Sequence, residues 1–590
     1  MSHLIDQTKI FFSMKTGLPI CAMGIFLVGC GGQDSAPPAV SPSPLVVHTE
    51  PAAPTPAPVP VPVGRTAASA SPTTIPVINF LAMNNAVAGA RPVPDCTPQG
   101  AGVRYDAGSA SYATLNHIPW DKLLPDDVVC VPYRAQPYRN KISFITRGAA
   151  GHPIRLVGLR GPNGERPVID GDQATTSPLI TPAANDAYLQ DFGLISFNYH
   201  FLKPVGAPWG WHPGFVTITG LKIQHASGQY AYTDAAGATR SYASFSSGVY
   251  INSGDNIVIE DSEINDNSLG IFANSHEPVS ANSPGELTAQ NITIRGNYIH
   301  SNGDTTHLGI HNVYVEAFGC NIIGNYFGHK VGNVGTNLKS RCSHERIYAN
   351  YFSGGAQSLL MLVDPQSGWD PLGTQPDFEP TVVAGNLLEN PFGASTYEAM
   401  VNFGGDGSTL PNQYRKTLLM VHNTIFDNRH GGRITLFSSL DSTHTGLLTS
   451  QWVANNLIVN QWDGTTGTSV DEFALASYDA NVFLTTNWIA SNVVKVGQYN
   501  THHGSVTGWG AQLTGNNPML MGTLLTDPRP AANSPLVDAA TPFTSLPAAS
   551  KASTVTDYAL YEFTGTPSTP WFRKRVIKGA VADIGAYETP

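Results

Sequence analysis

The second half of the chain repeats one short phrase, in which a small or polar residue is followed by Asn and two apolar residues: Gly296-Asn297-Tyr298-Ile299, Gly324-Asn325-Tyr326-Phe327, Ala349-Asn350-Tyr351-Phe352, Gly385-Asn386-Leu387-Leu388, His422-Asn423-Thr424-Ile425 and Asn455-Asn456-Leu457-Ile458. Successive Asn residues are 28, 25, 36, 37 and 33 positions apart, a spacing typical of solenoids. Each phrase adjoins a β-branched or aromatic run such as Ile292-Thr293-Ile294, so we predict a parallel β-helix. Asn suits a bend because it tolerates left-handed backbone angles, and stacked Asn side chains can form a hydrogen-bonded ladder.

Composition agrees with a solenoid of strands and turns. The chain has 590 residues, of which 58 are Gly and 45 Pro, and only 13% are charged, which argues against long surface helices. A solenoid grows by adding turns, so this length does not require several domains. The net charge of −11 provides no broad basic field, and we therefore expect no nucleic acid partner.

The amino terminus carries an export signal. Lys9 and Lys15 precede an apolar stretch at 20–28, which ends in Leu27-Val28-Gly29-Cys30. This pattern resembles a bacterial lipoprotein signal peptide, which implies removal of residues 1–29 and lipidation of Cys30; an ordinary secretory signal is the alternative. Either way we expect export, to the outer membrane or the cell surface, with membrane contact only through the lipid.

A Pro- and Ala-rich linker follows, and four further Cys residues lie beyond it. We predict lipid attachment and linker over 30–75 and the β-helix over 76–590, with an amino-terminal cap at about 95–185. Cys320 and Cys342 are 22 residues apart, about one coil, so they could face each other on adjacent turns. Cys96 and Cys130 would then staple the cap. Spacing alone does not fix connectivity, and two pairs of free thiols are the alternative.

Several stretches resemble the pectate-lyase-like β-helix superfamily: His311-Asn312-Val313-Tyr314-Val315, Asn337-Leu338-Lys339-Ser340-Arg341, Ile347-Tyr348-Ala349-Asn350, Ser534-Pro535-Leu536-Val537-Asp538 and Ala582-Asp583-Ile584-Gly585-Ala586-Tyr587-Glu588. The resemblance covers about residues 95–590 and implies a single right-handed parallel β-helix with side loops. The two final stretches resemble the last coil of exported bacterial members.

The alternation of strand side chains predicts an exterior cluster. With turns at Ser262, Asn325 and Asn350, the residues that face inward are Val249, Ile251, Val313, Val315, Leu338 and Ser340. The outward residues are Tyr250, Tyr314 and Lys339 in one column, Asn252, Glu316 and Arg341 beside it, Phe272 and Asn274 on the intervening turn, and Asp364 on the turn after. Adjacent coils lie about 4.8 Å apart, so these side chains should share one site.

Lys339 and Arg341 carry the chemical prediction. A lyase of uronic-acid polymers must neutralise the sugar carboxylate, remove the neighbouring C–H proton and protonate the departing oxygen. Lys can be the base where burial or a nearby Arg lowers its pKa, and Arg suits carboxylate binding. No acidic residue flanks either cation in its strand. The alternative is that both are solvated charges of the outer face.

At one position this sequence departs from the pattern of the superfamily. In the alginate and chondroitin B lyase branch, Lys lies in an Asn-Lys-Ser-Cys run and an Arg follows one turn later. Lys339-Ser340 is similar, but the place of that Arg, near Leu360, is apolar. Many relatives hold Ca²⁺, for which Glu316 and Asp364 could offer oxygen ligands; no run matches a dedicated calcium loop, so plain polar face residues are the alternative.

The remaining candidates complete a lyase site. We predict His311 or Tyr314 as the proton donor, and sugar contacts from Tyr250, Asn252, Phe272, Asn274 and His344. Aromatic residues that merely pack beneath loops are the alternative.

The sequence thus predicts an exported, monomeric lyase acting on an acidic polysaccharide, with Ca²⁺ as a candidate cofactor. Two alternatives remain. A glycoside hydrolase would need paired carboxylates, and the polygalacturonase motifs are missing. A non-catalytic glycan-binding or adhesion protein would need only the Tyr and Asn columns.

Overall fold

The computed structural model describes the solenoid and its C-terminal segment. The described residues are 91–180, 190–197, 211–274, 289–305, 307, 309–332, 335–354, 358–365, 371–374, 378–390, 399–406, 415–427, 433–438, 449–460, 472–477, 480–496, 504–546 and 560–590. They all belong to the unit Gly64–Pro590. The predicted signal segment 1–29, Cys30 and the linker to residue 75 lie outside them. Over these ranges no helix is long and apolar enough to cross a membrane.

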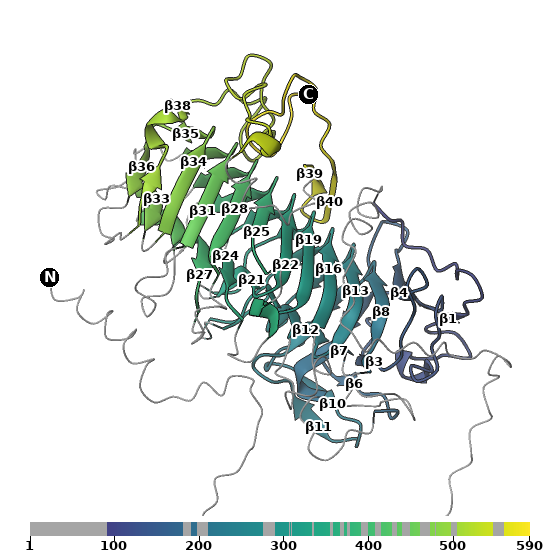
Figure 1. Cartoon of the computed structure of the whole chain (residues 1–590). Helices are drawn as coiled ribbons and strands as arrows, with labels where there is room; N and C mark the ends of the chain where they lie inside the picture. Colours follow the sequence, from purple (N-terminus) through teal and green to yellow (C-terminus); the bar gives the residue numbers. More distant parts are fainter. Residues whose placement is uncertain are drawn as a thin grey trace, which may run out of the picture. The chain divides into compact units, whose positions relative to one another are not determined.

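Three long parallel sheets form the coils, and the chain visits them in a fixed order (Figure 1). Sheet 1 contains β3 (Ile142–Phe144), β7 (Gly193–Phe197), β12 (Ser247–Ile251), β15 (Leu269–Ala273), β18 (Val313–Val315), β21 (Thr336–Ser340), β24 (Ser358–Val363), β27 (Ala399–Gly404), β30 (Arg433–Ser438), β33 (Glu472–Ser477) and β36 (Val493–Val496).

Sheet 2 contains β1 (Arg104–Asp106), β2 (Val128–Pro132), β4 (Ile154–Leu159), β8 (Gly214–Thr219), β13 (Gly254–Glu260), β16 (Ala289–Arg295), β19 (Phe318–Ile323), β22 (Ser343–Tyr348), β25 (Thr381–Ala384), β28 (Thr417–Val421), β31 (Thr449–Ala454), β34 (Ala480–Thr485) and β37 (Val506–Thr507). Sheet 3 contains β5 (Val168–Asp170), β9 (Lys222–Gln224), β14 (Glu263–Asn265), β17 (Tyr298–His300), β20 (Tyr326–Phe327), β23 (Tyr351–Ser353), β26 (Leu387–Asn390), β29 (Thr424–Asp427), β32 (Leu457–Asn460), β35 (Trp488–Ala490) and β38 (Leu513–Gly515).

The remaining elements are small. They are a three-stranded sheet of β6 (Ala174–Thr175), β10 (Ala231–Thr233) and β11 (Thr239–Ser241), a hairpin of β39 (Tyr561–Thr566) and β40 (Thr569–Lys574), and the 3₁₀ turns Leu115–His117, Pro371–Thr374, Trp509–Ala511 and Phe543–Ser545. The predicted parallel β-helix is therefore confirmed, and β10 and β11 lie in a side loop between β9 and β12.

The interior is a stack of aligned apolar side chains. One register column of sheet 2 runs through Ile259, Ile294, Ile322, Ile347, Val383, Met420, Val453 and Leu484. All of these side chains are buried in one cluster. Each coil thus covers the apolar surface of the next, which is how short strands that could not fold alone become stable.

The turns from sheet 2 to sheet 3, which we name the ladder corner, carry the repeated Asn. Each Asn side-chain amide donates to the side-chain oxygen of the next coil at 2.9–3.1 Å, from Asn297 through Asn487 to Gln512. The left-handed backbone lies one residue earlier than we predicted: it belongs to residues such as Gly296, at φ +62°, and Ala349, at φ +50°. Asn is therefore required for the ladder, and the preceding residue makes the bend.

A second, shorter Asn ladder was not foreseen. It joins Asn267, Asn302, Asn312 and Asn337 at the turns from sheet 3 to sheet 1, with amide-to-oxygen distances of 3.1, 3.1 and 2.7 Å. The connections there differ in length, so these residues show no regular spacing in the sequence.

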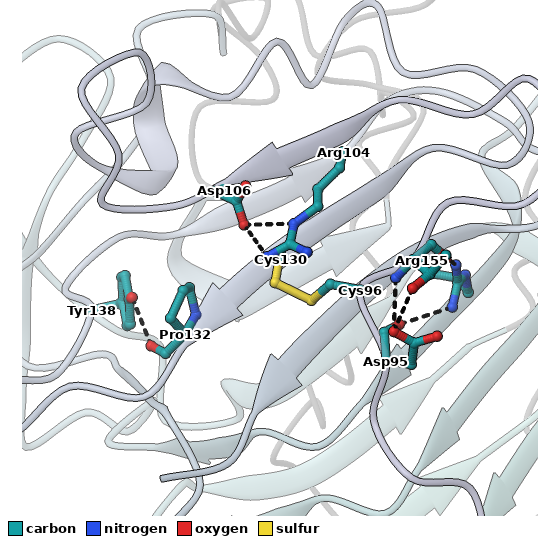
Figure 2. Close-up of a disulfide and its surroundings, with 9 residues drawn as sticks. Asp95, Cys96, Arg104, Asp106, Cys130, Pro132, Tyr138 and Arg155 are labelled. Atoms are coloured by element: carbon teal, nitrogen blue, oxygen red, sulfur yellow. Dashed lines mark hydrogen bonds and ion pairs between the residues drawn. A yellow bond between two sulfur atoms is a disulfide. The ribbon is translucent and has the colours of Figure 1, made fainter.

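Both predicted disulfides are present. Cys96 pairs with Cys130 in the amino-terminal cap, where Arg155 also donates to the Asp95 carbonyl at 3.0 Å (Figure 2). Cys320 pairs with Cys342, one coil further on. The second bridge fixes the turn that follows Arg341 to a strand of sheet 2.

The C-terminal segment corrects one expectation. Residues 582–588 do not form the last coil, because the final strands of the solenoid are β36, β37 and β38. Instead they lie along the ladder corner, where the Gly585 amide donates to the Asn455 carbonyl at 2.8 Å. The hairpin β39–β40 packs Trp571 and Phe572 against the outside of sheet 2.

Candidate functional site

The predicted register holds on the outer face of sheet 1. Tyr314 pairs with Lys339 on the adjacent coil, while Val313, Val315 and Leu338 are buried in the core. The middle of the outward column reads Ser196, Tyr250, Phe272, Tyr314, Lys339, Met361 and Asn402. Three consecutive aromatic residues, Tyr250, Phe272 and Tyr314, are followed by Lys339 on the next coil.

The aromatic part is a continuous stack. The rings of Tyr250 and Phe272 are stacked with centroids 5.5 Å apart, and Phe272 meets Tyr314 edge to face at 5.2 Å. Tyr250 and Phe272 are almost fully buried, and the Tyr250 hydroxyl donates to Asn252 at 3.2 Å. These residues support Tyr314 from below, and a sugar cannot stack on Tyr250 or Phe272 while they remain covered.

Asp406 forms an ion pair with each of the two predicted cations, Lys339 and Arg341. Its Oδ2 accepts hydrogen bonds from Lys339 Nζ at 2.7 Å and from Arg341 Nη2 at 2.5 Å. The residue follows strand β27, two coils beyond Lys339. No acid flanks these cations within their strand, as predicted, but Asp406 reaches them from a later coil, so neither is a free surface charge.

Arg341 is the centre of the cluster. Its Nε donates to the Tyr314 hydroxyl at 3.0 Å, and its Nη1 donates to the Asp364 carbonyl and lies 3.6 Å from the Asp364 carboxylate. Asp364 in turn accepts the Asp406 backbone N–H at 2.6 Å. Glu316, whose backbone continues the register of Arg341, is buried on the coil below. Two cations therefore face three carboxylates.

Burial governs the proton equilibria of this cluster. Burial lowers the pKa of Lys339 from its ordinary value, against the opposing effect of Asp406. Burial raises the pKa of Tyr314, and Arg341 only partly opposes this effect. Burial alone would raise the pKa of Asp406, but Lys339 and Arg341 outweigh it and hold that pKa below its usual value. Lys339 is thus a stronger candidate base than an exposed Lys, and Tyr314 is an acid that stays protonated.

His311 is unsuited to the acid role that we predicted. Its Nδ1 accepts the Thr336 backbone N–H at 3.0 Å, so the ring proton of the neutral form lies on Nε2. Burial, with the nearby charge of Lys339, moves the His311 pKa well below its ordinary value. A neutral imidazole that already carries its only proton on Nε2 is a hydrogen-bond donor rather than a general acid.

Three predicted contact residues lie around the cluster. Asn274 and Asn252 continue the second column below Glu316, since the Asn274 amide donates to the Ile251 carbonyl at 3.0 Å and the Glu316 amide to the Ala273 carbonyl at 2.9 Å. His344 lies on β22, in the neighbouring sheet 2. Their roles toward a substrate remain predictions.

The predicted calcium ligands Glu316 and Asp364 belong to the charge network around Arg341. No three His, Cys, Asp or Glu side chains in the described part of the chain are grouped so as to hold a metal ion. The carboxylates of Asp364 and Asp406 already accept from the backbone, Lys339 or Arg341. Calcium binding by this chain remains a prediction.

Arg415 is a second residue that sequence reasoning missed. It is fully buried, and its guanidinium donates to the carbonyls of Val363 at 2.7 Å and Cys342 at 2.6 Å. These carbonyls adjoin Asp364 and Arg341, so Arg415 fixes the two turns that carry the cluster. Asp406 had one signal in the sequence, as a lone acid in a Gly-rich run after an apolar strand; Arg415 had none.

Comparison with known proteins yields structural similarity alone. No protein-family model and no curated protein sequence matches the chain. The structure is similar to pectate lyase Pel9A (12% identity, TM-score 0.35, covering 80% of this chain and 90% of that one). It is also similar to an alginate lyase from Paenibacillus sp. str. FPU-7 (9%, 0.28, 70% and 98%) and to the surface protein and adhesin PfbA of Streptococcus pneumoniae (11%, 0.28, 66% and 90%).

Those solved structures include both enzymes and an adhesin. At such identities and TM-scores they carry no argument about activity. The fold assignment rests on the strand pairing described above, and the resemblance noted in the sequence is confirmed at the level of fold.

Proposed function

We propose that the protein is an exported polysaccharide lyase that cleaves a uronic-acid-containing glycan by β-elimination. The observation that supports this proposal is the pairing of Lys339 with Tyr314 on adjacent coils, with Lys339 Nζ 5.3 Å from the centre of the Tyr314 ring. A base of lowered pKa and a protonated hydroxyl thus lie side by side, which is the arrangement that an elimination requires.

The residues have separate roles in the proposed reaction. Lys339, in its neutral form, removes the proton from the carbon next to the sugar carboxylate. The electron pair left behind forms the C=C bond, and the adjacent C–O bond breaks. Tyr314 protonates the departing oxygen, and Arg341, through its hydrogen bond to the Tyr314 hydroxyl, stabilises the phenolate that results. Arg341 also supplies positive charge near the sugar carboxylate.

A panel of uronic-acid polymers tests this proposal. The purified protein should release a product with the ultraviolet absorbance of an unsaturated sugar, with and without EDTA to test for a metal. Lys339→Ala should lower the rate by at least about 100-fold, because general base catalysis contributes that much. Lys495→Ala, at an exposed Lys on β36 of the same sheet, is the matched control and should change nothing.

Two outcomes would reject the elimination. If no polymer yields the unsaturated product, the protein is not a lyase of these polymers, and glycan binding without cleavage would then support the adhesion alternative. Release of reducing sugar without that absorbance would indicate hydrolysis. Hydrolysis is the second candidate because three carboxylates, of Glu316, Asp364 and Asp406, lie near Arg341 in the charge network.

A further inference from the structure

Asp406 occupies a place that suits the carboxylate of a sugar. One of its oxygens accepts from both Lys339 and Arg341, at 2.7 and 2.5 Å, so the two cations act as a single two-donor clamp. Two converging charged donors are the usual means by which proteins hold a carboxylate. The clamp is complete in the structure, but a residue of the chain itself fills it.

Asp406 is also the outermost member of this group. Its side chain is 31% exposed, whereas those of Lys339 and Arg341 are 12% and 3% exposed. A ligand that approaches from solvent therefore meets Asp406 first. The backbone of Asp406 is held separately, through its N–H bond to Asp364, so its side chain can leave the clamp by rotation without unfolding the turn.

The charges around the clamp indicate how Asp406 would decide which ligand binds. With Asp406 in place, one carboxylate already occupies both Lys339 and Arg341, and Glu316 and Asp364 also act on Arg341 electrostatically. An approaching anion would be repelled. Once Asp406 has turned away, an incoming carboxylate takes its place on Arg341, and Lys339, released from its ion pair, can take the neutral form in which it acts as the base.

We propose that Asp406 is a specificity-determining residue, an internal carboxylate that holds the Lys339–Arg341 clamp until the carboxylate of a uronic-acid ligand exchanges with it. This inference rests on the proposed function for the identity of the ligand. Weak binding of single uronic acids follows, since each must displace Asp406; a longer chain gains further contacts that favour the exchange.

Binding measurements on the full chain test this exchange without requiring turnover. The probe is galacturonate, with glucose as the neutral comparison, and the readout is calorimetric affinity. Asp406→Asn keeps the shape but weakens the bond to both cations, so affinity for galacturonate should rise about tenfold, the equivalent of one charge-assisted hydrogen bond. Asp406→Glu keeps the charge and should bind as weakly as the original protein. Affinity for glucose should not change.

Asp527→Asn is the matched control. Asp527 also accepts from a cation, Arg529, at 2.7 Å, and its side chain is 29% exposed. Its substitution should leave galacturonate binding unchanged.

An unchanged or lowered affinity in Asp406→Asn would overturn the proposal, as would an equal gain for glucose. Failure of Asp406→Asn to fold would overturn it too, by showing that the ion pair is structural. Tighter galacturonate binding without any unsaturated product would keep the exchange and reject the lyase activity.

Discussion

Two corners of the solenoid follow opposite rules. At the ladder corner the turn from sheet 2 to sheet 3 is two residues long in coil after coil, as in Gly296-Asn297 and Gly324-Asn325. At the turn from sheet 1 to sheet 2, which we name the site corner, Glu316-Ala317 and Arg341-Cys342 are also two residues long, but the next connections are 364–380 and 405–416. The ladder corner keeps the same length from coil to coil and so holds the coils in register, whereas the connections of the site corner vary in length.

The candidate site lies where the connections of the site corner change from two residues to more than ten. Asp364 and Asp406 are the residues at, or next to, the start of these two long connections. Both interact with Arg341, which lies in the two-residue turn one coil before the first of them. A regular corner can place side chains only in columns. An irregular one can bring two carboxylates onto a cation from later coils, which is what a chemical site needs. The predictions that follow test this division, from the largest expected effect to the smallest.

Removal of one rung of the ladder corner should have the largest effect. Asn350→Ala leaves the Asn325 backbone N–H without its acceptor and the Ile322 carbonyl without its donor, and the Asn325 side-chain amide loses one of its three acceptors. Each buried group without a partner costs about 1–3 kcal/mol, so the free energy of unfolding should fall by about 5 kcal/mol in denaturant titrations. A loss below about 1 kcal/mol would show that the ladder is not what holds this corner.

The site corner should be less sensitive. Arg341→Lys retains the charge but loses the fork that joins Tyr314, Asp364 and Asp406, so we expect a loss of about 2 kcal/mol in unfolding free energy. Arg529→Lys, at a more exposed pair, is the control and should cost less than about 1 kcal/mol. If Arg341→Lys costs more than Asn350→Ala, the site corner is also the main structural corner.

The hairpin adds a third test at the ladder corner. In Gly296→Ala, the new Cβ would lie 2.2 Å from the Trp571 ring, at a backbone φ of +62°. We expect a loss of about 2 kcal/mol in unfolding free energy, and about half of that in a Trp571→Ala background, where only the backbone strain remains. Gly237→Ala, with φ +85° and open space around its Cβ, gives the cost of strain alone. Equal costs at the two glycines would mean that the hairpin is not docked there.

The smallest effect is a pH dependence on the site side. Because folding lowers the pKa of His311 below its ordinary value of 6.5, the unfolded chain binds more protons at acidic pH, and the free energy of unfolding should fall as the pH drops below 6.5. His311→Gln should reduce this slope in melting measurements. His307→Gln, at an exposed His, should not. An unchanged slope in His311→Gln would place the titration elsewhere, for example at His422, which is also buried with a lowered pKa.

The features that recur from coil to coil could be predicted from the sequence. The Asn phrase locates the ladder corner, and counting outward from it by alternation places Tyr314 over Lys339, as the strand pairing confirms. Asp406 and Arg415 lie in or at the end of a twelve-residue connection at 405–416, where alternation no longer applies. Their contacts with Lys339 and Cys342 span two coils, and no local pattern encodes such a distance.

The left-handed turn residue was misplaced for a related reason. Asn is the residue that recurs in the phrase, so the bend was assigned to it. The ladder Asn residues, such as Asn297, are not among the residues with positive φ, whereas the preceding position has positive φ with Gly, Ala, His, Asn or Thr, from Gly296 to Thr486. Because many residue types take this positive φ, a single sequence does not show which position makes the bend.

The docked hairpin has a consequence for biosynthesis. Trp571 and Phe572 cover Gly296 and Gly324, which are translated some 250 residues earlier. The coils can stack as they emerge, but the apolar outer side of sheet 2 around Tyr348 and Val382 is sheltered only when the last few dozen residues arrive. A chain cut short before residue 560 would lack this cover and expose an apolar flank, the kind of patch that promotes aggregation.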